Sequence, residues 1–278
     1  MIPSTFDYEV AESTEQAVSL LGSREDAKVL AGGHSLIPLL KLRFARPSLL
    51  VDIGRIDGFS YVRDEGEWLA IGAMTRYKTI REDPLVQEHC PIVSYTAGLI
   101  GDPQVRHCGT IGGSLAHGDP ASDLPAVVLA LAAELVIAGP AGVRKVPAAE
   151  FFHGVFDTAV GPGELLTEIR VPKLGTWTGW SYLKFTRRAQ DWATVGVAAI
   201  VRRENGGVDE ARIALTNMGA TPLRATAAEQ ALVAGEADPA AHMADGTAPA
   251  SDVSASAEFR SHLARVMGKR AIEEALSR

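Results

Sequence analysis

Apolar and polar residues follow one another in blocks whose spacing changes along the chain. At residues 13–16 the order Ser-Thr-Glu-Gln has the spacing of a helix capping box, and the apolar residues after it stop at Gly22, so we expect a helix over residues 13–22. Helical composition predicts further helices over residues 36–43, 84–100 and 124–133, and the glycine-rich stretch 101–123 is expected to be a loop. Short apolar or alternating runs predict strands over residues 28–31, 49–53, 68–71, 134–138, 143–146 and 165–171.

The last third of the chain has a different pattern. A linker of Gly, Thr and Trp over residues 173–179 indicates a domain boundary. Three strand-like runs follow it, at residues 182–186, 194–203 and 211–216. The turn Glu-Asn-Gly-Gly at residues 204–207 predicts a hairpin between the second and third runs, and helical, Ala-rich sequence follows from Arg224. The chain is therefore predicted to be α+β, with a C-terminal antiparallel sheet backed by helices.

Charge and cysteine content narrow the class of protein. The 278 residues carry a formal net charge of −7 without a run of Lys and Arg, so no nucleic-acid partner is expected. The longest apolar run, residues 125–133, is shorter than the ~20 residues of a membrane span, and the first residues lack a secretion signal. Cys90 and Cys108 are too few for a disulfide scaffold or a Cys-ligated iron–sulfur cluster. These features predict a cytoplasmic globular protein.

Two short glycine turns are the first candidate binding elements. The first glycine signature is Ala-Gly-Gly-His-Ser at residues 31–35, and the second glycine signature is Thr-Ile-Gly-Gly-Ser at residues 110–114. Consecutive glycines let backbone N–H groups reach phosphate oxygens without Lys or Arg, so the pair fits a pyrophosphate. The alternative, that both are only tight turns, stays open. Neither has the spacing of a Rossmann fingerprint or of the phosphate-binding loop of nucleoside triphosphatases.

Acidic and histidine residues near the second glycine signature allow several interpretations. Asp123, at the start of an apolar helix, could cap that helix or bind a ribose, and Asp119 competes with it. Four candidate zinc ligands cluster here: His107, Cys108, His117 and Asp119. Their spacing matches no known closed zinc site, and no serine lies in a nucleophile elbow. We therefore predict no catalytic residue and no metal ligand.

A dense charged and aromatic group follows the predicted strand at residues 182–186. Its members are Lys184, Arg187, Arg188, Asp191 and Trp192. One interpretation is a solvated strand end. The other is that the lysine and the indole lie against an electron-poor planar ring, whose reduced anion a nearby cation would stabilise.

Long stretches of the sequence resemble one protein family. The segments AGGHSLIPLLKLR, from residue 31, and GTIGGSLAHGDPASDLPA, from residue 109, are similar to the two FAD-binding signatures of the flavoprotein subunits of molybdenum hydroxylases. Other segments resemble the medium subunits of the carbon monoxide dehydrogenase branch: MIPSTFDYE, PQVRHCGT, GELLTEIRVP, YLKFTRRAQDWA and LTNMGATPLRA. The resemblance spans nearly the whole chain.

The resemblance implies an FAD-binding fold of the vanillyl-alcohol-oxidase (PCMH) type. FAD-binding subdomain 1 would span residues 1–55, subdomain 2 residues 56–174, and a C-terminal flavoprotein domain residues 175–278. The implied cofactor-binding residues are Ala31, Gly32, Gly33, His34, Ser35, Leu36, Ala73, Ile100, Thr110, Gly112, Gly113, Ser114, His117, Asp123, Leu166, Lys184 and Trp192.

The resemblance also implies roles within this set. Both glycine signatures would wrap the pyrophosphate of FAD, and Asp123 would hold the adenosine ribose. Lys184 would lie near the flavin ring, with Ile100 and Leu166 packing on the flavin side. Two positions depart from the family pattern, because Trp192 stands where Tyr is expected and a serine occupies position 114, where Asn is common.

The implied function is electron transfer inside a complex. A large partner subunit would hold the molybdenum cofactor, a small partner subunit would hold 2Fe-2S clusters, and FAD on this chain would pass electrons to an external acceptor. The family implies a dimer of heterotrimers, and a quinone acceptor would bring peripheral association with a membrane. The alternatives are a stand-alone FAD-dependent oxidase of the same fold and a cofactor-free assembly protein.

Overall fold

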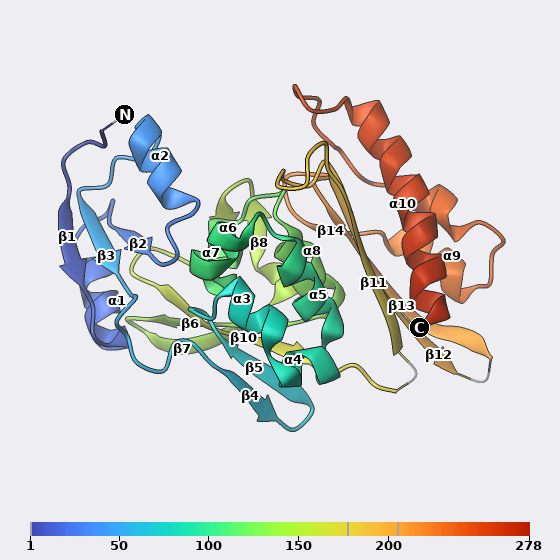
Figure 1. Ribbon diagram of the computed structural model, residues 1–278, viewed down its shortest axis with the longest axis horizontal. Coiled ribbons are helices and arrows are strands. Elements are labelled where there is room, and N and C mark those ends of the chain that lie inside the picture. The colour runs from blue at the N-terminus through green and yellow to red at the C-terminus, as the bar shows by residue number, and fades with distance from the viewer. Residues whose placement is uncertain (1, 177, 205) are drawn as a thin grey trace.

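A computed structural model describes residues 2–176, 178–204 and 206–278 of the chain, whose three larger β-sheets lie side by side (Figure 1). The N-terminal sheet is parallel, in the strand order β1-β3-β2. Its strands are β1 (Asp7–Val10), β2 (Lys28–Leu30) and β3 (Leu49–Asp52), and its helices are α1 (Thr14–Gly22) and α2 (Leu36–Leu42). Ser13 caps α1 by accepting a hydrogen bond from the Gln16 N–H, as the capping-box spacing predicts.

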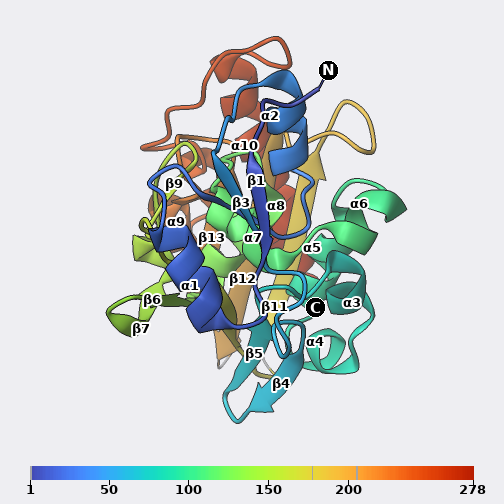
Figure 2. The same cartoon turned by 90° about the vertical axis from the view of Figure 1, so that its left-hand side faces the viewer.

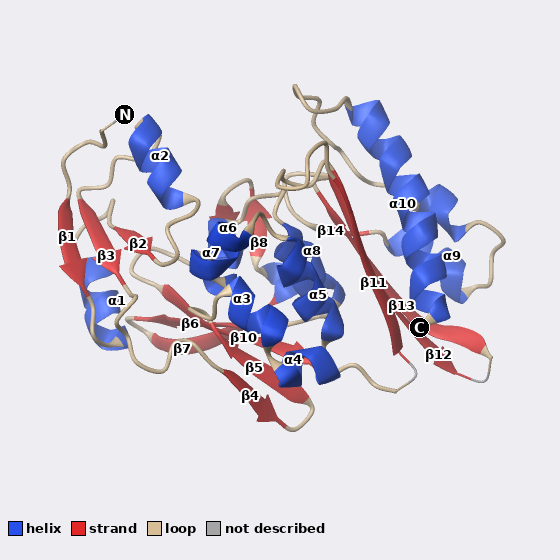
Figure 3. Ribbon diagram, viewed as in Figure 1, coloured by secondary structure: helices blue, strands red, loops and turns tan. Residues whose placement is uncertain are grey.

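The middle sheet is antiparallel, in the strand order β4-β5-β10-β6-β7. Its strands are β4 (Val62–Glu65), β5 (Trp68–Gly72), β6 (Glu134–Gly139), β7 (Gly142–Pro147) and β10 (Leu165–Pro172). Six helices cover one of its faces (Figure 3): α3 (Tyr77–Glu82), α4 (Pro84–His89), α5 (Pro91–Leu99), α6 (Pro103–Cys108), α7 (Ile111–His117) and α8 (Asp123–Ala130). The short 3-10 helix η1 (Ala148–Glu150) leads into a small hairpin of β8 (Phe152–Gly154) and β9 (Asp157–Thr158).

The C-terminal sheet is antiparallel, in the strand order β11-β12-β13-β14. Its elements are β11 (Thr178–Phe185), β12 (Val195–Glu204), β13 (Gly207–Thr216), β14 (Leu223–Arg224), α9 (Thr226–Val233), the 3-10 helix η2 (Pro239–His242) and α10 (Ala257–Ser277). Helices α9 and α10 cover its outer face (Figure 1). Its inner face packs on α5 and α8, because Tyr182, Ala198 and Ile200 belong to the same buried core as those helices. The last third is therefore packed tightly onto the middle of the chain.

Two predictions for the middle of the chain are wrong. The helix expected over residues 84–100 is two helices, because Pro91 has no N–H to continue the first and instead starts the second. The stretch 101–123, expected to be a loop, contains α6 and α7. Strand β4 and helix α3 were not predicted. The predicted hairpin turn includes Asn205, which lies outside the described residues.

Arg260 is the most deeply buried charged residue among those described, with 1% of its surface exposed. Its guanidinium donates to the Thr194 carbonyl, to the Ala250 carbonyl at 3.1 Å and to the Asp252 carboxylate at 2.6 Å. It therefore ties α10 to the start of β12 and to the loop before α10.

In the part of the chain that the structure describes, no helix combines the length and the apolar character that crossing a membrane requires.

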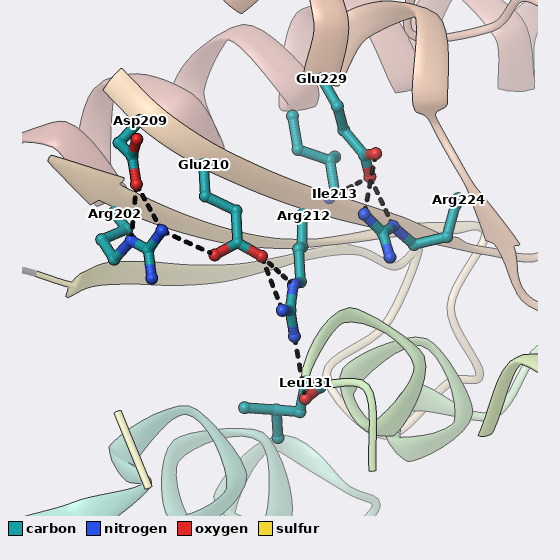
Figure 4. A network of polar contacts seen from close by, with 8 residues as sticks. All are labelled: Leu131, Arg202, Asp209, Glu210, Arg212, Ile213, Arg224 and Glu229. Atoms are coloured by element: carbon teal, nitrogen blue, oxygen red, sulfur yellow. Dashed lines mark hydrogen bonds and ion pairs between the residues drawn. The ribbon is translucent and has the colours of Figure 1, made fainter. Parts of the chain in front are cut away.

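An ion pair holds α9 to the C-terminal sheet, and a hydrogen bond connects that sheet to the end of α8 (Figure 4). Glu229 of α9 is buried, and its carboxylate accepts from the Ile213 N–H at 2.6 Å and from the Arg224 guanidinium at 2.5 and 2.8 Å. On the other side of the sheet Arg212 bonds Glu210 and donates to the Leu131 carbonyl at 3.4 Å. The Glu229 carboxylate thus accepts the hydrogen bond of a β13 backbone N–H in place of a neighbouring strand.

Replacement of Glu229 by alanine is expected to lower the free energy of unfolding by about 2 kcal/mol, because the buried Ile213 N–H loses its acceptor and Arg224 loses its partner. Urea denaturation measures this loss. Glu210→Ala is the matched control, since Glu210 is a third exposed, and should cost less than about 1 kcal/mol. Equal losses of unfolding free energy in the two variants would show that the burial of Glu229 does not increase its contribution to stability.

Candidate functional site

The two glycine signatures lie against each other although they are far apart in sequence. A Cβ atom on Gly32 would lie 2.3 Å from the Cys108 carbonyl oxygen and 2.9 Å from the Gly109 Cα. A Cβ atom on Gly113 would lie 3.7 Å from the Ala31 Cβ. Figure 1 shows the loop between β2 and α2 reaching toward α7. Glycine at these positions therefore brings the two backbones into contact.

The first glycine signature has backbone donors with no partner. The N–H groups of residues 32–35 donate to no acceptor within residues 2–176, 178–204 and 206–278. Gly33 has φ +73°, which an L side chain rarely adopts, and its carbonyl accepts from Ile37 at 2.9 Å to turn the chain into α2. Successive free N–H groups in a tight turn form a concave site for an anion. The residues present therefore fit the diphosphate of a dinucleotide.

The second glycine signature is built differently from the expectation that its N–H groups hold the pyrophosphate. Ile111 N–H donates to the Thr75 carbonyl at 3.1 Å, and Gly112 N–H donates to the Ala73 carbonyl at 2.9 Å. Gly113 N–H is bound by the Thr110 hydroxyl at 3.2 Å, which caps α7. These donors therefore serve the fold.

A buried polar cluster lies beneath this surface. The Ser114 and Ser122 hydroxyls are 2.7 Å apart, which ties α7 to the start of α8. Tyr77 lies below them, with its ring against Gly109, and burial raises the pKa of Tyr77 to about 12. Tyr77 is thus a neutral phenol at ordinary pH. Serine in place of the larger asparagine leaves position 114 bound to protein rather than extended toward a ligand.

Asp123 forms a buried ion pair with the C-terminal sheet. Its carboxylate accepts from the Tyr182 hydroxyl at 2.6 Å and from the Lys184 ammonium at 2.9 Å. The Asp123 and Lys184 side chains are 5% and 7% exposed. Burial raises the pKa of Asp123, while Lys184 and the Tyr182 hydroxyl act against that rise. Gly196 leaves room for the tyrosine, because a Cβ there would lie 2.7 Å from its hydroxyl.

This contact bears on two of the predicted roles. Asp123 was expected at the adenosine ribose and Lys184 at the flavin ring, which are at opposite ends of an extended FAD. The structure places the two charged groups 2.9 Å apart. The pair can therefore face only one part of the cofactor. The competing Asp119 carboxylate instead accepts from the Ala121 N–H at 2.9 Å and shapes the loop before α8.

The remaining residues that were predicted to bind the cofactor differ in their exposure to solvent. Ala73 and Leu166 are 3% exposed and lie in the core, while Ile100 and Leu36 are half-buried. His34 is exposed at the tip of the first glycine signature, and Trp192 is 57% exposed in the loop between β11 and β12. The candidate zinc ligands do not converge, since no group of three or more His, Cys, Asp or Glu that could hold a metal occurs among the described residues.

Tyr182 and Phe156 are two residues of this region that the sequence reasoning missed. Tyr182 has a signal in the sequence, because residues two apart on a strand share a face and Tyr182 precedes Lys184 by two. Phe156 has none, because its contact with His117 depends on how the hairpin of β8 and β9 folds over α7.

Comparisons with known proteins identify the family. A family described as the FAD binding domain in molybdopterin dehydrogenase matches residues 4–174, and the CO dehydrogenase flavoprotein C-terminal domain matches residues 180–275. The chain is 43% identical to the carbon monoxide dehydrogenase medium chain of Hydrogenophaga pseudoflava, over 100% of this chain and 99% of the relative. It is 41% identical to the 6-hydroxypseudooxynicotine dehydrogenase complex subunit alpha of Paenarthrobacter nicotinovorans, over 100% of this chain and 97% of the relative.

A solved structure gives the same result. A chain of the Hydrogenophaga pseudoflava carbon monoxide dehydrogenase that lacks the Mo-pyranopterin moiety superposes with a TM-score of 0.97 at 45% identity, covering 100% of this chain and 99% of that chain. This confirms the predicted α+β fold and the predicted resemblance. The chain thus belongs to the FAD-binding flavoprotein subunits of the molybdenum hydroxylases, a family of oxidoreductase subunits whose cofactor on this chain is FAD.

Proposed function

We propose that this chain is the FAD-binding electron-transfer subunit of a carbon monoxide dehydrogenase-like complex. A large partner subunit carries the molybdenum cofactor, where substrate is oxidised, and a small partner subunit carries the 2Fe-2S clusters. The chain takes electrons from these clusters and delivers them to an external acceptor. The observation that carries the proposal is the row of unpartnered N–H groups at residues 32–35 in a chain that is similar over its whole length to a subunit named a medium chain.

The assembly follows the same proposal. The complex is a dimer of heterotrimers in the cytoplasm, and a quinone acceptor brings it to a membrane surface without insertion. Within the chain, residues 1–55 and 56–174 form the two FAD-binding subdomains, and residues 175–278 form the C-terminal domain. Substrate identity is a property of the large subunit.

Each part of the site has one task in this proposal. The N–H groups of residues 32–35 bind the diphosphate, and Gly33 gives the turn the conformation that presents them. Gly113 lets α7 approach the first glycine signature at Ala31 and so helps to position those N–H groups. FAD, when bound, supplies reversible one- and two-electron chemistry, which the protein tunes through charges near the ring.

We place the pair of Asp123 and Lys184 at the ring end of FAD. Lys184 lies near the end of β11, and the loop that follows carries the exposed Trp192. Ile100, the other predicted ring-side residue, precedes α6, and its carbonyl accepts from Arg106 at 3.0 Å. In this arrangement Asp123 largely neutralises the charge of the Lys184 ammonium near the ring. Asp123 then lies at the ring end of FAD rather than at the adenosine ribose.

Purification of the chain with its natural partners tests the proposal. We expect flavin absorption at about 450 nm that corresponds to about one FAD per chain. We also expect a molybdenum-containing large subunit and an iron–sulfur small subunit to co-purify with the chain. Absence of FAD from both the isolated chain and the complex would overturn the proposal. Turnover of an alcohol by the isolated chain would instead support a stand-alone oxidase.

A further inference from the structure

Phe156 is an exposed aromatic residue in an unusual backbone conformation. It has φ +58°, and 58% of its surface is exposed. For a bulky residue a positive φ is an outlier that surrounding structure must enforce. Burial does not explain the choice of phenylalanine, because most of the side chain lies outside the core.

The neighbouring backbone holds Phe156 against the end of α7. Its N–H donates to the Gly118 carbonyl at 3.1 Å, and Gly118 ends the helix with φ +64°. A Cβ on Gly118 would lie 2.8 Å from Thr158 Cγ2, so glycine is needed for the hairpin of β8 and β9 to approach. The Phe156 and His117 ring centroids are 4.8 Å apart, with planes tilted by 32°. The two rings form one aromatic surface.

This aromatic surface lies one helical turn along α7 from Gly113, which lies next to the first glycine signature. Gly113 and His117 are four residues apart on α7, so they share a face of that helix, separated by about 6 Å of helical rise. The same face meets the first glycine signature at Ala31. Figure 2 shows α6, which follows the ring-side Ile100, on one side of α7 and β9 on the other. The aromatic surface therefore lies on the side of α7 away from α6.

His117 adds a neutral partner to this surface. Burial lowers the pKa of His117, against a smaller opposing influence of Asp119. The imidazole is thus uncharged at neutral pH and offers a flat π face. Bases stack on such aromatic side chains whatever their hydrogen-bonding pattern.

We propose that Phe156, braced by His117, is the platform on which the adenine of FAD stacks. The inference rests on the proposed FAD function and extends it to the adenosine half of the cofactor. Adenine lies one ribose beyond the diphosphate, which matches the short step along α7 from Gly113 to His117.

Binding of ADP and of FMN separates the two halves of the cofactor. ADP contains the adenine and the diphosphate, whereas FMN contains the ring and one phosphate. For Phe156→Ala in the full chain and in its complex, we expect the dissociation constants of ADP and FAD to rise about tenfold and that of FMN to stay unchanged. Val155→Ala is the matched control, because Val155 is 54% exposed in the same turn and should change none of the three. Phe156→Trp should retain tight ADP binding.

Each other outcome decides the question. Unchanged ADP and FAD binding by Phe156→Ala would overturn the stacking role. An equal loss for ADP and FMN would show that Phe156 only supports the fold of the site. Failure of the unchanged protein to bind either FAD or ADP would instead overturn the proposed function.

Discussion

Replacement of Gly32 by alanine is expected to weaken FAD binding strongly. The added Cβ would lie 2.3 Å from the Cys108 carbonyl oxygen and 2.9 Å from the Gly109 Cα, and both contacts are with backbone that no rotamer change can move. The first and second glycine signatures must therefore separate, which opens the diphosphate site. Overpacking of this kind costs about 1–3 kcal/mol, so FAD affinity should fall roughly 10- to 100-fold. Flavin absorbance per chain and the dissociation constant of FAD measure the effect.

The control for this prediction is Gly22→Ala. A Cβ on Gly22 meets no atom within 4 Å, and the residue has ordinary backbone angles at the end of α1. We expect full FAD retention in this variant. Gly113→Ala gives an intermediate case, because its closest contact is the Thr110 hydroxyl at 2.8 Å. Retention of FAD by Gly32→Ala with an unchanged dissociation constant would show that the contact between the two signatures does not shape the site.

The first glycine signature could be predicted from sequence because its geometry is local. A strand, a glycine turn and a helix start within a few residues suffice to place four N–H groups in a row. The second glycine signature resembles it in sequence, yet its donors are taken by the Ala73 and Thr75 carbonyls of a segment more than thirty residues earlier. Such long-range backbone pairing leaves no trace in a short motif. Similar glycines therefore have different tasks.

The same distinction applies to the charged residues. Position 123 was identified as important, but sequence spacing could not separate a helix cap from a ligand contact. The structure shows a third task, since Asp123 joins α8 to β11 through Tyr182 and Lys184. Pairing across about sixty residues depends on how the C-terminal sheet packs on the middle helices. The fold class followed from local patterns, whereas this junction required the tertiary arrangement.

Replacement of Asp123 by alanine is expected to cause the largest loss of stability. Lys184 would keep a buried charge without a partner, and the Tyr182 hydroxyl would lose its acceptor. Breaking a buried ion pair in this way costs about 3–5 kcal/mol. Urea denaturation of the cofactor-free chain measures the loss without a contribution from FAD binding. The control is Asp64→Ala, since Asp64 pairs with Lys173 at 2.6 Å but is 44% exposed, and its loss should stay below about 1 kcal/mol.

A double variant tests the cause of the loss. Asp123→Ala combined with Lys184→Met removes both charges, so it should be more stable than Asp123→Ala alone although it carries one more substitution. Additive losses would instead mean that the two residues stabilise the junction independently. Recovery of stability by the double variant without recovery of FAD binding would separate the two tasks of the pair. The charges would then be retained for the cofactor, because two apolar side chains could hold α8 and β11 together.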